Sequence, residues 1–203
     1  GDNLVWSRNG GLLRISGTGD MRDFTYGEDK PWESFKTSIY SIIIDEGVTS
    51  IGNLAFANCN NLTNVKIPNS VKTIGFNSFI YCYDLTSVAI PDSVTTIGSS
   101  AFYWCNSLKT VKIGNGVTTI GRSAFDGCTS MTSLTLGNSV TTIGNDAFDS
   151  CIGLTSVTIP SGVTYIGSEA FSNCDSLISV TIPDSVTTID SYAFYTCDSL
   201  TSV

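Results

Sequence analysis

The cysteines of this chain are spaced at a fixed interval of 23 residues, and seven phenylalanines repeat with the same step. The two series are Cys59, Cys82, Cys105, Cys128, Cys151, Cys174 and Cys197, and Phe56, Phe79, Phe102, Phe125, Phe148, Phe171 and Phe194. A fixed period of about 20 to 50 residues is typical of a solenoid, in which each repeat is one coil stacked on its neighbour. The spacing therefore predicts a stack of coils.

One copy, residues 85–105, shows what each coil is expected to contain. Residues 88–90 alternate as a short strand with one buried face, and residues 91–93 (Pro-Asp-Ser) are typical of a turn. Residues 94–97 are β-branched and favour a second extended segment. Gly98 is expected to reach positive φ, and residues 99–105 to form a turn or two of helix. Stacked coils would then pair their strands in parallel at about 4.8 Å.

The shared pattern is Leu-x-x-Val-x-Ile-Pro-x-Ser-Val-x-x-Ile-Gly-x-x-Ala-Phe-x-x-Cys, which resembles the BspA-like class of leucine-rich repeat. The resemblance covers residues 39–203 and implies an α/β-type repeat solenoid: a right-handed superhelix with parallel β-strands and short helical turns. We assign seven full 23-residue repeats from Ile39 to Ser199, and Leu200–Val203 begins an eighth.

Residues 1–38 do not follow the repeat and are expected to form an N-terminal cap. Residues 4–6 and 12–21 flank the turn 8–11 and predict a β-hairpin. Residues 31–35 are expected to form a short helical turn beneath it. Such a cap would cover the open end of the first coil.

The last coil carries no comparable polar cap over Phe194 and Leu200. Either further sequence follows in the natural protein, or this coil associates end to end with another chain.

Charge is unevenly distributed along the chain. Residues 1–122 hold ten acidic and ten basic side chains, whereas residues 123–203 hold eight acidic and no basic ones, which gives the net charge of −8. This surface disfavours nucleic acid and anionic membranes as partners. The sequence has no run of about 20 apolar residues, so no membrane span is predicted. The acidic half is either a solvated face or a patch for a basic partner or a weakly held calcium ion.

Several kinds of chemistry are excluded by composition. The chain has no histidine, so neither a Ser-His-Asp relay nor a His-activated thiol is available. The chain has no Cys-x-x-Cys pair, which is the usual sequence sign of a zinc site. Adjacent coils could bring cysteines within disulfide range, but seven cannot all pair, and we predict a ladder of buried free thiols. We expect no enzyme activity, no metal site and no cofactor.

An apolar cluster is predicted at the two positions between Phe and Cys, which are expected to point outward. Most coils have small or polar residues there. Two neighbouring coils instead have large side chains: Ile80, Tyr81, Tyr103 and Trp104, with Tyr83 just beyond Cys82. Exposed clusters of this composition are typical of interface hot spots. Alternatively, these side chains lie flat on one another and cover the groove between coils.

A second candidate surface is the outward face of the first strand of each coil. It is rich in threonine with some lysine, and its candidate contact residues are Lys66, Lys109, Lys112, Thr132, Thr135, Thr155 and Thr158. Such a face is either the ordinary exposed side of a β-sheet or a broad polar docking surface.

The family resemblance implies a secreted or cell-surface bacterial protein whose repeats adhere to host extracellular-matrix proteins or to other cells. A protein ligand is the partner that this implies. The alternative is an inert structural spacer within a larger surface protein.

Overall fold

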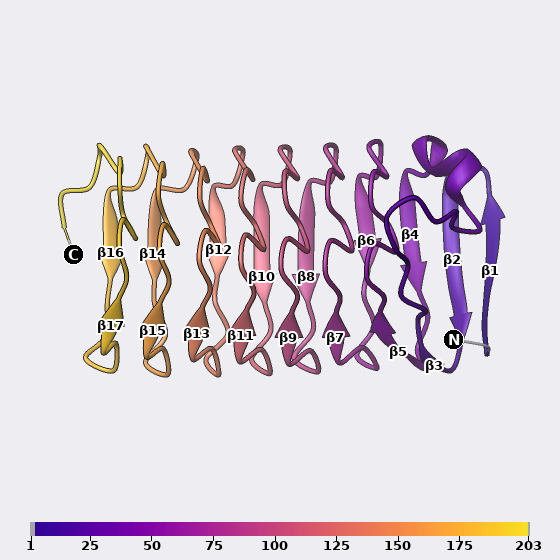
Figure 1. Ribbon diagram of the computed structural model, residues 1–203, viewed down its shortest axis with the longest axis horizontal. Coiled ribbons are helices and arrows are strands. Elements are labelled where there is room, and N and C mark those ends of the chain that lie inside the picture. The colour runs from indigo at the N-terminus through magenta and orange to yellow at the C-terminus, as the bar shows by residue number, and fades with distance from the viewer. Residues whose placement is uncertain (1–2, 203) are drawn as a thin grey trace.

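The 23-residue repeats form coils that stack along one axis, with the N-terminal hairpin at one end (Figure 1). The computed structural model describes residues 3–202. The predicted fold class is confirmed: two ladders of short strands run along the stack, and the coil-to-coil pairs are parallel.

The first ladder contains one strand from each coil, together with the hairpin strand that precedes them. Its coil strands are β4 (Ser41–Ile44), β6 (Asn64–Lys66), β8 (Ser87–Ile90), β10 (Thr110–Ile113), β12 (Ser133–Thr135), β14 (Ser156–Thr158) and β16 (Ser179–Thr181). Equivalent residues pair in register, as Val88 does with Val111. Their side chains alternate between the core and the surface, as the sequence predicts.

The second ladder is continuous from the cap to the last coil. It contains β3 (Gly19–Asp20), β5 (Val48–Ile51), β7 (Thr73–Ile74), β9 (Thr96–Ile97), β11 (Thr119–Ile120), β13 (Thr142–Ile143), β15 (Tyr165–Ile166) and β17 (Thr188–Ile189). Residues 91–94 form the turn that joins the two ladders, because the amide of Val94 donates to the carbonyl of Pro91 at 3.1 Å.

The first ladder is interrupted between β12 and β14. Among residues 3–202, no backbone hydrogen bond joins these two strands. The coil that contains β12 has Leu134 and Leu136 where most others have valine and isoleucine. Leucine suits a pleated strand less well than β-branched residues, and Leu134 is only partly buried.

Stacked phenylalanines form the centre of the core. Ring centroids of successive coils lie 5.1–5.5 Å apart from Phe56 to Phe194. The cap extends this ladder, because Trp32 stacks on Phe56 at 5.5 Å. Each ring therefore covers the next coil's apolar face, and an isolated coil would leave both faces exposed to water.

The segment from Gly98 to Cys105 is a run of turns, and the helix expected there is absent. Alternate amides bond locally and to the next coil: that of Tyr103 donates to Ser100 at 3.2 Å, whereas that of Phe102 donates to Ala124 at 2.8 Å. Ser100 and Trp104 have positive φ, which breaks a helical path. Stacking therefore takes up half of the amide donors that a helix would use internally.

The role expected for Gly98 is also wrong, because this glycine does not have positive φ. A Cβ atom there would lie 2.7 Å from the carbonyl carbon of Gly75 and 2.8 Å from the amide nitrogen of Phe76. Glycine is required at this position because the backbones of adjacent coils touch, and the left-handed residues come two and six positions later.

The cap consists of an antiparallel hairpin and a short 3-10 helix. Strands β1 (Leu4–Asn9) and β2 (Leu12–Gly17) pair with each other, and β2 then pairs in parallel with β4. The helix η1 spans Glu33–Ser38, close to the predicted turn at 31–35. Placing the boundary between cap and repeats at residue 38 stays a prediction.

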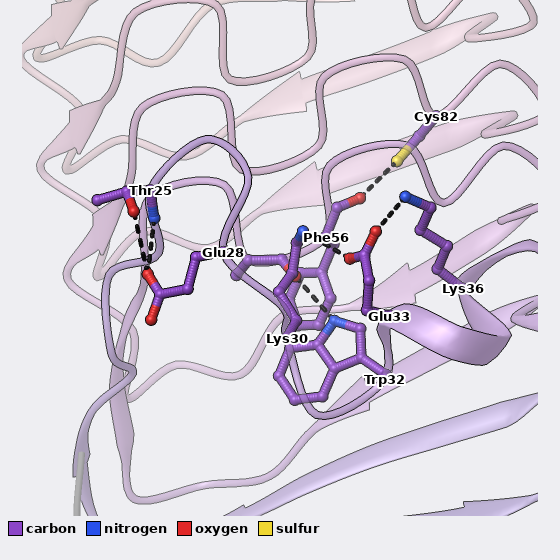
Figure 2. A network of polar contacts seen from close by, with 9 residues as sticks. Thr25, Glu28, Lys30, Trp32, Glu33, Lys36, Phe56 and Cys82 are labelled. Atoms are coloured by element: carbon purple, nitrogen blue, oxygen red, sulfur yellow. Dashed lines mark hydrogen bonds and ion pairs between the residues drawn. The ribbon is translucent and has the colours of Figure 1, made fainter.

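Figure 2 shows the junction between the cap and the first coils. The indole nitrogen of Trp32 donates to the carbonyl of Ala55 at 2.9 Å. Glu33 accepts hydrogen bonds from Lys30 and Lys36 on either side of it. The Trp32 contacts hold the cap against the first coil, whereas the charge-assisted pairs of Glu33 lie within the cap itself.

Candidate functional site

The backbone holds the two positions between Phe and Cys in register from one coil to the next. The amide of Tyr81 donates to the carbonyl of Tyr103 at 2.9 Å, and that of Trp104 donates to Asp126 at 2.8 Å. The amide of Gly127 donates to Asp149 at 3.0 Å. Side chains at these positions therefore form continuous columns along the stack.

Four aromatic residues of the predicted cluster lie together in these columns or next to them. The ring centroid of Tyr81 lies 5.8 Å from that of Tyr83 and 5.8 Å from that of Tyr103, and those of Tyr103 and Trp104 lie 6.2 Å apart. Tyr81 and Tyr103 are half-buried, whereas Tyr83 and Trp104 are 38% and 45% exposed. The cluster thus covers the groove between coils and still presents aromatic surface to solvent.

Ile80 does not belong to the exposed cluster. Its side chain is 8% exposed and packs against the core, so the expectation that all five side chains point outward is wrong for this residue. The turn geometry explains this difference. The next residue, Tyr81, has positive φ, and its side chain points outward instead.

The indole of Trp104 lies over Gly127 of the next coil. A Cβ atom on Gly127 would lie 2.6 Å from Cδ1 and 2.8 Å from Nε1 of that indole. Most coils have Asn, Ser, Thr or a larger residue at this position. The missing side chain of Gly127 is what allows the indole to lie flat on the stack.

A pocket opens beside this indole, which we name the aromatic–acidic pocket. It holds about 400 Å³ and spans three coils. Its main lining residues are Tyr103, Trp104, Asp126, Gly127, Asp149 and Ile152.

The electrostatics of the pocket are dominated by its carboxylates. Burial, followed by repulsion from Asp149 and Asp146, raises the pKa of Asp126 to about 7. Burial and the charge of Asp126 also raise the pKa of Tyr103. The pocket therefore disfavours further negative charge.

The strand-face residues are exposed on the first ladder, in a different segment of the coil. All seven predicted positions face solvent: Lys66, Lys109, Lys112, Thr132, Thr135, Thr155 and Thr158. Lys112 pairs with Thr135 across β10 and β12, and Thr158 pairs with Thr181 across β14 and β16. Ligand contact stays a prediction both for this face and for the aromatic cluster.

The predicted burial of the cysteines is confirmed. The thiols of adjacent coils donate to phenylalanine carbonyls in the preceding coil, as Cys105 does to Phe79 at 3.3 Å. Burial raises the pKa of Cys59 to about 12 and that of Cys105 further still. Thiols in this state are weak nucleophiles at neutral pH.

Asp126, Asp149 and Gly127 were not recognised from the sequence as site residues. They occupy the same two columns as the aromatic residues, one and two coils further along. Reading the columns across successive repeats would have found them. The acidic character of this half was visible only as an overall charge.

Comparisons with known proteins agree with this fold. The chain matches the family described as "BspA type Leucine rich repeat region (6 copies)" over residues 33–151 and 118–203. The crystal structure of a leucine-rich repeat protein from T. pallidum has a TM-score of 0.74 at 24% identity, covering 98% of this chain and 89% of that one. No curated protein sequence is significantly similar to the chain.

A leucine-rich cell surface protein from Faecalibacterium prausnitzii A2-165 aligns at 22% identity, covering 98% of this chain and 92% of that one, with a TM-score of 0.37. Between residues 3 and 202 the structure has no helix with the length and hydrophobicity needed to span a lipid bilayer.

Proposed function

The chain belongs to the BspA-type leucine-rich repeat family, and on this premise we propose that it is a secreted or cell-surface adhesion module. Its ligand would be a host extracellular-matrix protein or a protein on another cell. Repeat proteins of this kind typically bind through the extended surfaces that stacking creates, without catalysis.

The observation that carries this proposal is the exposed indole of Trp104, which is 45% exposed and lies beside Tyr103 and a pocket. Large aromatic side chains next to a depression are typical of residues that dominate binding energy at protein interfaces. The free thiols are compatible with an extracellular setting, because burial protects them from solution oxidants.

The test is a surface-binding screen of the purified chain against immobilised fibronectin, fibrinogen, collagen and mucin at physiological salt. We expect saturable binding to at least one of them. The variant Tyr103→Ser/Trp104→Ser should lose at least ~10-fold in affinity, as expected for truncation of a hot spot. A second variant changes Thr132, Thr135, Thr155 and Thr158 to Asp and probes the strand face.

Tyr192→Ser/Tyr195→Ser is the matched control, because these two tyrosines are 65% and 56% exposed and lie in the last coil. Binding that this control retains and the Tyr103/Trp104 variant loses would support adhesion through the aromatic cluster. Equal loss in both would point to non-specific aromatic adsorption.

The alternative function is an inert spacer. The continuous phenylalanine ladder favours it, because a stack with one uninterrupted core is a stiff rod. A spacer would bind none of the four surfaces and would tolerate both sets of substitutions without any change.

A further inference from the structure

We propose that the aromatic–acidic pocket binds a basic side chain, lysine or arginine, of the protein partner. This inference rests on the proposed adhesion function and specifies the chemistry that the partner must present. It makes the pocket, rather than the whole aromatic cluster, the centre of recognition.

The charge of the pocket favours a basic ligand. Asp126 and Asp149 lie in adjacent coils, and residues 123–203 contain no lysine or arginine. The nearest basic residue in the sequence, Arg122, pairs with Asp146 at 3.1 Å. In the part of the chain that the structure describes, no ion pair involves Asp126 or Asp149. A cation supplied by a partner would neutralise them.

One wall of the pocket is aromatic. Trp104 presents its ring at the pocket, and Tyr103 and Ile152 add apolar surface. A guanidinium or ammonium group is attracted to an indole face, and its aliphatic stem packs on apolar side chains. Carboxylates and an aromatic face together therefore match both parts of a lysine or arginine side chain.

A basic side chain fits the pocket better than a calcium ion or a neutral sugar does. A calcium ion takes six to eight oxygen ligands, and among residues 3–202 no three His, Cys, Asp or Glu side chains converge on one point. A neutral sugar could stack on the indole but would leave the two carboxylates repelling each other. After burial, repulsion from Asp149, Asp146 and Glu169 raises the pKa of Asp126, and a cationic ligand would relieve that repulsion whereas a neutral one would not.

The geometry also indicates preorganisation. Asp149 accepts a hydrogen bond from Nδ2 of Asn173 at 2.8 Å, which orients its carboxylate without neutralising it. Gly127 leaves space for the indole, so the ring already packs beside the pocket without a ligand. A site with both groups already in place loses less entropy on binding.

The experiment follows the indole N–H resonance of Trp104 by NMR in the full chain, assigned with the variant Trp104→Ser. The probes are four pentapeptides, acetyl-Gly-Gly-X-Gly-Gly-amide, with X as arginine, lysine, norleucine or glutamine. We expect the arginine and lysine peptides to shift this resonance saturably. The neutral peptides should bind at least ~10-fold more weakly, as expected for loss of a charge-assisted contact.

The key variant is Asp126→Asn/Asp149→Asn, which should weaken the arginine peptide by at least ~10-fold. Its control is Asp184→Asn/Asp198→Asn, two exposed residues whose replacement changes the net charge equally, from −8 to −6. The control should bind within about 2-fold of the unmodified chain, because distant exposed charges are screened. Gly127→Ala should displace the indole and weaken binding without altering any charge.

Methyl glucoside is added to the peptides as a neutral sugar probe. Equal binding of the norleucine peptide or of methyl glucoside would overturn the proposal, since the pocket would then be an apolar or a sugar site. Unchanged arginine binding in the Asp126/Asp149 variant would overturn it as well. The two proposals can fail separately. Peptide binding with a negative matrix screen would reject adhesion to those proteins alone, whereas matrix binding that survives Asp126→Asn/Asp149→Asn would reject the basic-side-chain pocket alone.

Discussion

Ser78 is a buried hydroxyl in an apolar column. The six remaining coils, from the first to the seventh, all have alanine at this position. In the second coil the serine is fully buried, and its Oγ atom has no hydrogen-bond partner. A buried polar group that has lost its hydrogen bonds to water destabilises the folded state. At the scale of single residues, Ser78 therefore lowers the stability of the folded state.

Ser78→Ala should raise the free energy of unfolding by about 1 kcal/mol, because it removes an unsatisfied hydroxyl with little change in volume. Urea denaturation of the two chains measures the difference. Ser172→Ala is the control, since Ser172 is also buried but accepts a hydrogen bond from Asn173 at 3.0 Å. That variant should lose stability, and a loss in both would mean that Ser78 has a partner.

Asp126 should make stability depend on pH. Its pKa is about 7 in the folded chain because of burial and neighbouring carboxylates, against 3.8 ordinarily. Between these values the folded state binds more protons than the unfolded state, so this residue's contribution to stability falls as pH rises through the window. Asp126→Asn should therefore be more stable than the unmodified chain above about pH 7.

The advantage of Asp126→Asn should shrink as pH falls toward about 4, where Asp126 is protonated in the folded state. Urea midpoints measured at several pH values give this difference. An advantage that stays constant across the range would show that Asp126 titrates normally.

At the scale of one coil, strands were predictable from the sequence and the third segment was not. Alternating apolar residues and β-branched pairs indicate β8 and β9, which the structure contains. Ala101, Phe102 and Cys105 are spaced as on one face of a helix, and all three are buried. The same inward positions are also produced by successive turns, and only hydrogen bonds to the next coil distinguish these turns from a helix.

Gly121→Ala should destabilise the stack by at least ~2 kcal/mol, because the new Cβ atom must displace backbone of the preceding coil. It would lie 2.6 Å from the amide nitrogen of Ser99. Gly10→Ala is the matched control: Gly10 has positive φ but open space around it. Thermal unfolding compares the two, and similar losses would mean that close approach at position 121 costs no more than the strain of an alanine at positive φ.

At the scale of the whole molecule, stability comes from contacts between coils. Phe125 stacks on both neighbours, at 5.1 Å and 5.4 Å, whereas Phe194 stacks, among residues 3–202, on Phe171 alone and is only partly buried. In a solenoid the interface between neighbouring repeats supplies most of the favourable energy. The same substitution should therefore cost more in the middle of the array.

Phe125→Ala should lower the free energy of unfolding by about 3–5 kcal/mol, as a large-to-small change in a packed core. Phe194→Ala should cost clearly less. Chemical denaturation monitored by far-UV circular dichroism tests both variants. Equal losses would contradict the view that neighbouring coils, rather than the single coil, are the unit of stability.

The sequence by itself determined the length of the coil, the positions of its strands and the buried columns of phenylalanine and cysteine. A strict period forces equivalent residues into equivalent environments, so one repeat describes all of them. The tertiary structure alone decided how unlike side chains pack across coils: the indole of Trp104 lies over Gly127, and Asp126 and Asp149 line one pocket beside it. The physical reason is that these contacts join residues about one period apart, and their partners are set by the register of stacking rather than by local propensity.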